Sequence, residues 1–112
     1  MFRHHFALLV SASTALLSGC AATPPSVEET KLVESAIARA IDAGAAIYAP
    51  AELSLAQDKL ALARRFLRAH SDTKPAIWLL EQSQVDAELA FIKAAATTRR
   101  TAVSDRLGEL RR

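Results

Sequence analysis

Residues His70, Ser71 and Asp72 bring together in sequence the three residue types of a nucleophilic triad. A nucleophile and its base must meet through the fold, and consecutive residues of one turn cannot normally adopt the required geometry. We therefore expect His70 to be an exposed turn residue near a helix C-terminus, where a partial positive charge is stabilising. The stretch does not predict a catalytic site.

Carboxylates offer a second route to chemistry, through acid–base catalysis. Glu81 and Glu88 are one heptad apart and share a helical face, with Asp86 between them and Asp58 upstream. Acid–base catalysis needs a desolvated cleft, and a short alanine-rich chain offers no obvious one. We expect solvated charges at these positions, no enzymatic activity, no metal site and no cofactor.

Cys20 is the only cysteine, so it cannot form an intramolecular disulfide or complete a zinc set. It follows the stretch MFRHHFALLVSASTALLSG, in which Arg3 precedes an apolar run and then small residues. The apolar run is shorter than the roughly 20 residues that a transmembrane helix needs. This three-part layout predicts a cleaved secretory signal.

The end of this segment, Leu17-Ser18-Gly19-Cys20, resembles the lipobox of bacterial lipoproteins. The resemblance implies a diacylglyceryl group on the Cys20 thiol, an N-acyl chain on its new amine, and signal peptidase recognition through Leu17, Ser18 and Gly19. Residues 1–19 would be the signal peptide and residues 20–26 a proline-containing tether. Ala21, where an aspartate would favour the inner membrane, implies a periplasm-facing outer-membrane anchor, with the inner membrane left open. The alternatives are a buried free cysteine, or an ordinary signal cut nearby.

Alanine-rich composition with only 5% aromatic residues favours an all-α fold. Three helices are expected: one that starts after Pro25 with Ser26 as N-cap, one from Pro50 to about Ala69, and one from Pro75 to Leu107 or beyond. Apolar residues recur at helical spacing in each helix. The first stripe contains Val33, Ile37, Ala40, Gly44 and Ile47, and the second contains Leu53, Ala56, Leu60, Ala63 and Leu67, widened by Leu62 and Phe66.

The third expected helix carries two apolar rows, with Trp78 and Leu79 expected to pack near the turn. Asp72 or Thr73 is a candidate cap for this helix. Short connections predict an antiparallel hairpin or three-helix bundle, in which the long last helix projects past its neighbours. The two rows are Leu80, Ala87, Phe91 and Ala94, and Val85, Leu89, Ile92 and Ala96.

The stretches AIARAIDAGAAIYAPAELSLAQDKLALA and WLLEQSQVDAELAFIKA resemble the small helical domain of unknown function designated DUF4398. The similarity covers roughly residues 33–96, within an expected helical domain at 27–112. It implies an alanine-rich helical fold in a bacterial envelope lipoprotein. It implies no reaction.

Basic residues gather near the C-terminus, although the net charge of the whole chain is only +2. This candidate contact strip could bind an anionic glycan, lipid headgroups or an acidic envelope protein. Nucleic acid is not expected as a partner outside the cytoplasm, and no aromatic stacking residue follows Phe91. Exposed apolar residues, including Leu32, Ile41 and Val103, point to self-association. The strip consists of Lys93, Arg99, Arg100, Arg106, Arg111 and Arg112.

The sequence therefore predicts a lipid-anchored, non-catalytic helical interaction or structural module of the periplasm. Two alternatives stay open: a soluble secreted helical protein, and an accessory subunit of an envelope enzyme complex.

Overall fold

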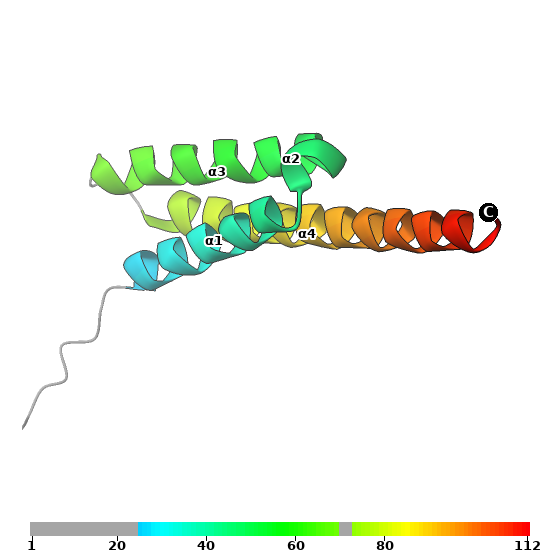
Figure 1. Ribbon diagram of the computed structural model, residues 1–112. Coiled ribbons are helices and arrows are strands. Elements are labelled where there is room, and N and C mark those ends of the chain that lie inside the picture. The colour runs from blue at the N-terminus through cyan, green and yellow to red at the C-terminus, as the bar shows by residue number, and fades with distance from the viewer. Residues whose placement is uncertain (1–24, 70–72) are drawn as a thin grey trace, which may run out of the picture.

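A computed structural model describes residues 25–69 and 73–112, which form a small bundle of helices (Figure 1). The helices are α1 (Pro25–Asp42), α2 (Ala45–Tyr48), α3 (Pro50–Arg68) and α4 (Thr73–Leu110). The predicted all-α fold is confirmed, and the one-turn helix α2 is an addition to the three expected helices.

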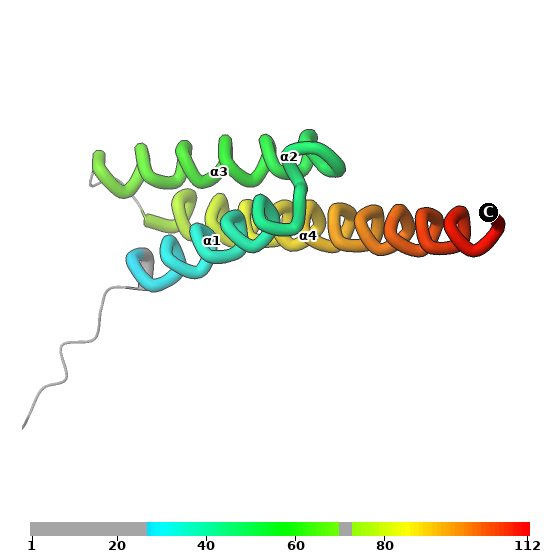
Figure 2. The backbone as a smooth tube through the Cα atoms, viewed as in Figure 1, coloured from blue at the N-terminus to red at the C-terminus, as the bar shows by residue number. Residues whose placement is uncertain are grey.

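Helix α4 packs against both α1 and α3 and is the shared element of the bundle. The tube in Figure 2 shows that α1 and α4 run in the same direction and that α3 runs antiparallel to both. This order follows from the short connections, since each reverses the chain.

The C-terminal part of α4 extends beyond the other helices, as predicted (Figure 1). At 1.5 Å per residue, the 38 residues of α4 span about 57 Å, whereas the 19 residues of α3 span about 28 Å. Ala94 is the last buried residue of α4, and every residue from Thr98 onward is exposed. We call residues 98–110 the extension.

The core is a seam of small side chains between closely spaced helices. The predicted stripe of α3 is confirmed, because Leu53, Ala56, Leu60 and Ala63 are buried and Phe66 and Leu67 pack against the core. Leu62 was expected to widen this stripe but is exposed. Alanine dominates the seam, at positions 36, 40, 45, 49, 56, 63, 87, 90 and 94.

The prediction that Gly44 and Ile47 continue the first helix was wrong. Gly44 has φ of 90°, a left-handed conformation that glycine adopts without steric cost, and its N–H donates to the Ile41 carbonyl at 2.9 Å. This turn ends α1, so α2 restarts in a new direction and leaves Ile47 exposed. Ala49 then leaves helical geometry before Pro50, which opens α3 as predicted.

The expectation that Trp78 packs near the turn was also wrong, although Leu79 is buried. The row Leu80, Ala87, Phe91 and Ala94 does face the bundle, but Val85, Leu89 and Ile92 of the second row are exposed. The physical reason is the narrow seam: residues that face both α1 and α3 must be small, so the bulky side chains lie on the opposite face of α4.

The helix starts differ slightly from expectation. Helix α1 begins at Pro25, so Ser26 lies in its first turn and the expected cap is displaced, because the fixed φ of proline already suits a first helical position. Helix α4 begins at Thr73 with Pro75 in its first turn, which confirms the predicted start, whereas Asp72 lies outside the described residues.

Candidate functional site

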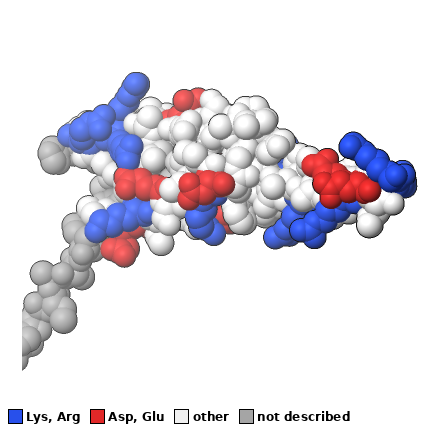
Figure 3. Space-filling model, viewed as in Figure 1, with Lys and Arg blue, Asp and Glu red and all other residues white. Residues whose placement is uncertain are grey.

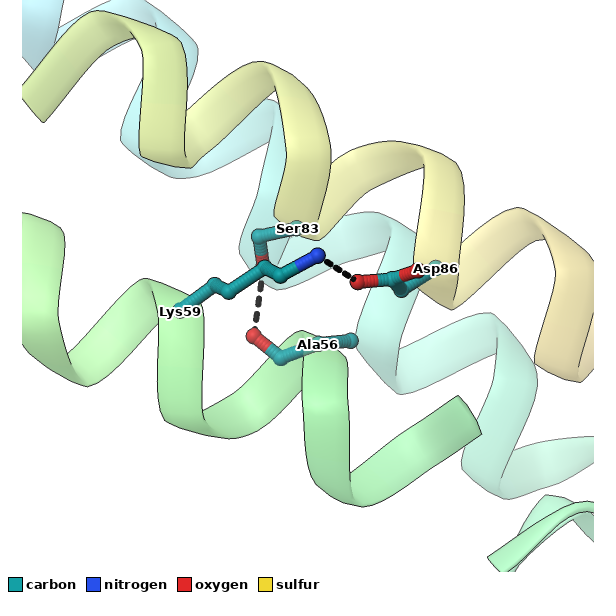
Figure 4. Close-up of polar contacts among 4 residues, drawn as sticks. All are labelled: Ala56, Lys59, Ser83 and Asp86. Carbon is teal, nitrogen blue, oxygen red and sulfur yellow. Dashed lines mark hydrogen bonds and ion pairs between the residues drawn. The ribbon is translucent and has the colours of Figure 1, made fainter. Parts of the chain in front are cut away.

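Two polar contacts fix α3 against α4 at the centre of the bundle (Figure 4). The buried Ser83 hydroxyl donates a hydrogen bond of 2.5 Å to the Ala56 carbonyl. Nearby, the ammonium group of Lys59 lies 2.6 Å from an Asp86 carboxylate oxygen, in a partly buried ion pair. A buried hydroxyl needs such a partner, and only a small residue at 83 lets the two backbones approach. These contacts are structural.

Further contacts between helices lie at the edges of the bundle. Glu34 of α1 pairs with Arg64 of α3, and Glu52 of α3 pairs with Lys93 of α4. The hydrogen bond from Lys93 lowers the pKa of Glu52 below its usual value. Lys93, a member of the predicted contact strip, thus has a partner within the chain and joins α4 to α3.

The Arg39 guanidinium of α1 lies 5.6 Å from the centre of the Phe91 ring of α4. This is within the range of a cation–π contact. This contact joins α1 to α4 at the edge of the core. Both α1 and α3 are therefore held to α4 by a polar or cationic contact.

The candidate carboxylates are not gathered in one place. Asp58, Glu81 and Glu88 are exposed as expected, but Asp86 is partly buried in its pair with Lys59, which corrects the expectation of a solvated charge. Over residues 25–69 and 73–112, no group of three or more His, Cys, Asp or Glu side chains is placed to hold a metal ion. His70 lies outside the described residues.

The main exposed apolar feature of the described surface is a stripe on the face of α4 opposite the bundle. Trp78, Val85 and Ile92 stand one heptad apart and are 61%, 65% and 60% exposed. A second row follows at the same spacing, with Leu89, Ala96, Val103 and Leu110. We call these two rows the outer stripe. Its length and continuity are typical of a face that packs against another helix.

Charge changes sign along the outer stripe. Glu81 and Glu88 flank its first half, whereas Arg99 and Arg106 continue the row of Trp78, Val85 and Ile92 on the extension. Figure 3 shows both basic and acidic groups on the extension, and further basic groups at the opposite end of the visible face. The outer stripe is therefore apolar along its length, acidic at one end and basic at the other.

Two shallow hollows lie along the same helix. One, of about 380 Å³, is lined by Trp78, Glu81, Val85 and residues of the Lys59–Asp86 pair. The other, of about 400 Å³, lies on the extension beside Arg99, Val103 and Leu107. Both are shallow surface depressions, which suit the side chains of a partner better than an enclosed small molecule.

The predicted site residues fall into two groups. Arg99, Arg100 and Arg106 lie exposed on the extension, with Arg111 and Arg112 just past the end of α4. The lipidation residue Cys20 and the recognition residues Leu17, Ser18 and Gly19 lie outside the described residues. Sequence reasoning missed the outer stripe as a surface, although the heptad spacing from Trp78 to Ile92 is the signal that could have revealed it.

None of the helices in the described part of the chain combines the length and the apolar content that crossing a membrane requires. No curated protein and no solved structure matched the chain in the comparisons. A family model did match: residues 28–106 fit the model described as "Domain of unknown function (DUF4398)". This match covers well over half of the chain and includes α2 and α3 in full, so the chain belongs to the DUF4398 family.

Proposed function

We propose that the protein is a lipid-anchored, non-catalytic helical module of the bacterial periplasm, which binds another envelope component through α4. The observation that carries the proposal is the tetrapeptide Leu17-Ser18-Gly19-Cys20, which ends a signal-like apolar run just before the helical unit. Two or more acyl chains on one cysteine anchor a protein stably, whereas a single chain does not.

The distance between the proposed anchor and the bundle is short. Five peptide steps separate Cys20 from Pro25, so the start of α1 would lie within about 18 Å of the Cα atom of Cys20. Arg65 and Arg68 are exposed at the end of α3, on the same side of the bundle as the start of α1 (Figure 1). Basic side chains there would face anionic lipid headgroups, which supports the proposed orientation.

The extension points away from that end of the bundle (Figure 1). An anchored molecule would therefore hold the basic groups of the extension, and the part of the outer stripe that lies on it, away from the start of α1. This arrangement suits a role in positioning a second envelope component, and it needs no reaction.

Metabolic labelling with palmitate tests the anchor directly. The wild-type chain should incorporate the label, Cys20→Ser should abolish it, and the matched neighbour Ala21→Ser should retain it. Unlabelled wild-type protein, or label that survives in Cys20→Ser, would reject lipidation. Mass spectrometry of the mature N-terminus separates the anchored form, which begins at acylated Cys20, from a soluble secreted form cut by the ordinary signal peptidase.

The outer-membrane location has its own test. By the lipobox resemblance, Ala21→Asp should shift the protein toward the inner-membrane fraction of an enteric-type host, while Ala21→Ser stays with the outer membrane. Equal fractionation of both variants would contradict sorting by this residue.

A non-catalytic role predicts that Asp58, an exposed carboxylate of α3 outside the outer stripe, is dispensable. Alanine at Asp58 should leave the cellular phenotype of a deletion strain fully complemented. Selective loss of complementation by a variant that still folds and is still lipidated would favour an enzymatic role.

A further inference from the structure

We propose that the outer stripe of α4 pairs with the outer stripe of a second copy of this chain, with the two helices antiparallel. The inference rests on the proposed role of α4 as an interaction surface, but it does not require the lipid anchor. Because antiparallel pairing puts the starts of the two α1 helices at opposite ends, two copies anchored in one membrane would pair with their α4 helices lying along it. Three observations carry it: the exposed apolar rows, the heptad-spaced acidic pair Glu81 and Glu88, and the heptad-spaced basic pair Arg99 and Arg106.

The register follows from matching those charges. Consider two antiparallel α4 helices in which Ala94 of one copy lies level with Ala94 of the other along the helix axis. Arg99 of one copy then lies beside Glu88 of the other, and Arg106 lies beside Glu81. The two-fold axis repeats both pairs, so four ion pairs form in total. Complementary flanking charges of this kind set the orientation and register of paired helices.

The same register also matches the apolar rows. Trp78 falls opposite Leu110 of the second copy, and Val85 falls opposite Val103. Trp78, which is largely exposed in the single chain, would then be covered. An exposed tryptophan within an apolar row is typical of the anchor residues in protein interfaces.

A parallel arrangement does not satisfy the charges. Parallel helices in register would place Arg99 beside Arg99, Arg106 beside Arg106 and Glu88 beside Glu88, and like charges in such positions are destabilising. The antiparallel arrangement places each of these groups beside one of opposite sign, so the sequence of α4 selects it.

The face is accessible to a second copy. Helices α1 and α3 pack on the opposite side of α4, against Ser83, Ala87, Ala90 and Ala94. The extension of each copy would lie along the outer stripe of the other bundle, so the part of α4 that lacks partners within one chain gains one from the second copy.

Cysteine cross-linking in cells tests both the partner and the register. Two differently tagged full-length copies are co-expressed, one with Val85→Cys and the other with Val103→Cys, and treated with a short thiol-reactive cross-linker. The antiparallel pair predicts a cross-link between the two tags and none within either variant expressed alone, because residues 85 and 103 are about 27 Å apart along the helix. The chain that carries only Cys20 is the background control.

Charge reversal is the second part of the cross-linking experiment. Arg99→Glu with Arg106→Glu should lower the cross-linked fraction at least about tenfold. The matched reversal Arg111→Glu with Arg112→Glu should not, because this register places neither residue beside Glu81 or Glu88. Adding the reversals of both acidic residues, E81R and E88R, to R99E and R106E restores opposite charges and should restore the cross-link.

Three outcomes would overturn the inference: no cross-link between the tags, a cross-link of Val85→Cys with itself, or a cross-link that the charge reversals leave unchanged. Circular dichroism of each purified variant shows whether it folds. Palmitate labelling is followed in the same cells, so failure of the pairing can be told apart from failure of the anchor.

Discussion

The alanine seam predicts that one enlarged side chain at its centre will destabilise the whole bundle. Ala87 of α4 is fully buried and lies in the cluster that α1 and α3 also form. Ala→Leu adds three carbons, worth about 2.4 kcal/mol if they could be buried without strain. The seam has no room for them, because the residues that face α4 include Ala36, Ala40 and Ala56. We therefore expect overpacking, which destabilises by about 1–3 kcal/mol.

That loss is large compared with the stability available. A helical unit of this size has a free energy of unfolding of about 4–13 kcal/mol. Each kcal/mol changes the Tm of so small a domain by about 4–8 °C, so Ala87→Leu should lower it by roughly 5–20 °C. The measurement is thermal unfolding followed by far-ultraviolet circular dichroism.

The matched control is Ala61→Leu, the same substitution at an exposed position of α3. It should leave the free energy of unfolding within about 0.5 kcal/mol of the wild type, as surface substitutions usually do. If Ala87→Leu melts at or above the wild-type temperature, the helices are not held close by small side chains and the packing argument fails.

Four further substitutions each change a single position and are measured by the same unfolding assay. Gly44→Ala should lower the free energy of unfolding by about 1–2 kcal/mol, because φ of residue 44 is positive. Gly108→Ala, in a helix with open space around it, should raise the free energy of unfolding by about 0.5–1 kcal/mol. Ser83→Ala should cost about 1 kcal/mol through loss of its buried hydrogen bond. Glu52→Gln should lower the Tm near neutral pH, where the Lys93 pair is formed; because the pKa of Glu52 is lowered, the difference from wild type should vanish as the pH falls through that pKa.

Much of the fold could be predicted because the prolines that mark helix starts and the spacing of apolar residues agree in α3 and α4. Pro50 and Pro75 mark helix starts, and the spacing from Leu53 to Ala63 identifies the buried face of α3. The turn at Gly44 could not be located from periodicity alone, because the apolar spacing continues in phase through it as far as Ile47. Only the left-handed φ of Gly44 separates α1 from α2.

The candidate surface was harder to predict because large apolar residues were expected to be inside. In this bundle the buried face of α4 has Leu79 and Leu80 near its start and otherwise only small residues, while Trp78 and Val85 are outside. The small buried residues are Ala76, Ser83, Ala87, Ala90 and Ala94. Hydrophobicity alone cannot distinguish the two faces, since both are apolar. The discriminating property is side-chain size, which becomes informative only once the spacing between helices is known.

A helix with two apolar faces needs two sets of neighbours. Helices α1 and α3 supply the first set, and their contacts with α4 end near Ala94, where the α1–α3 connection closes the bundle. The second face continues for the full length of α4 and is covered by no element of the described chain. Because burial of large side chains contributes more than burial of alanines, much of the free energy that α4 can gain from packing lies on the face that the single chain leaves open. Under the pairing proposed above, the bundle serves to present that face, and binding depends on the outer stripe more than on any hollow of the described surface.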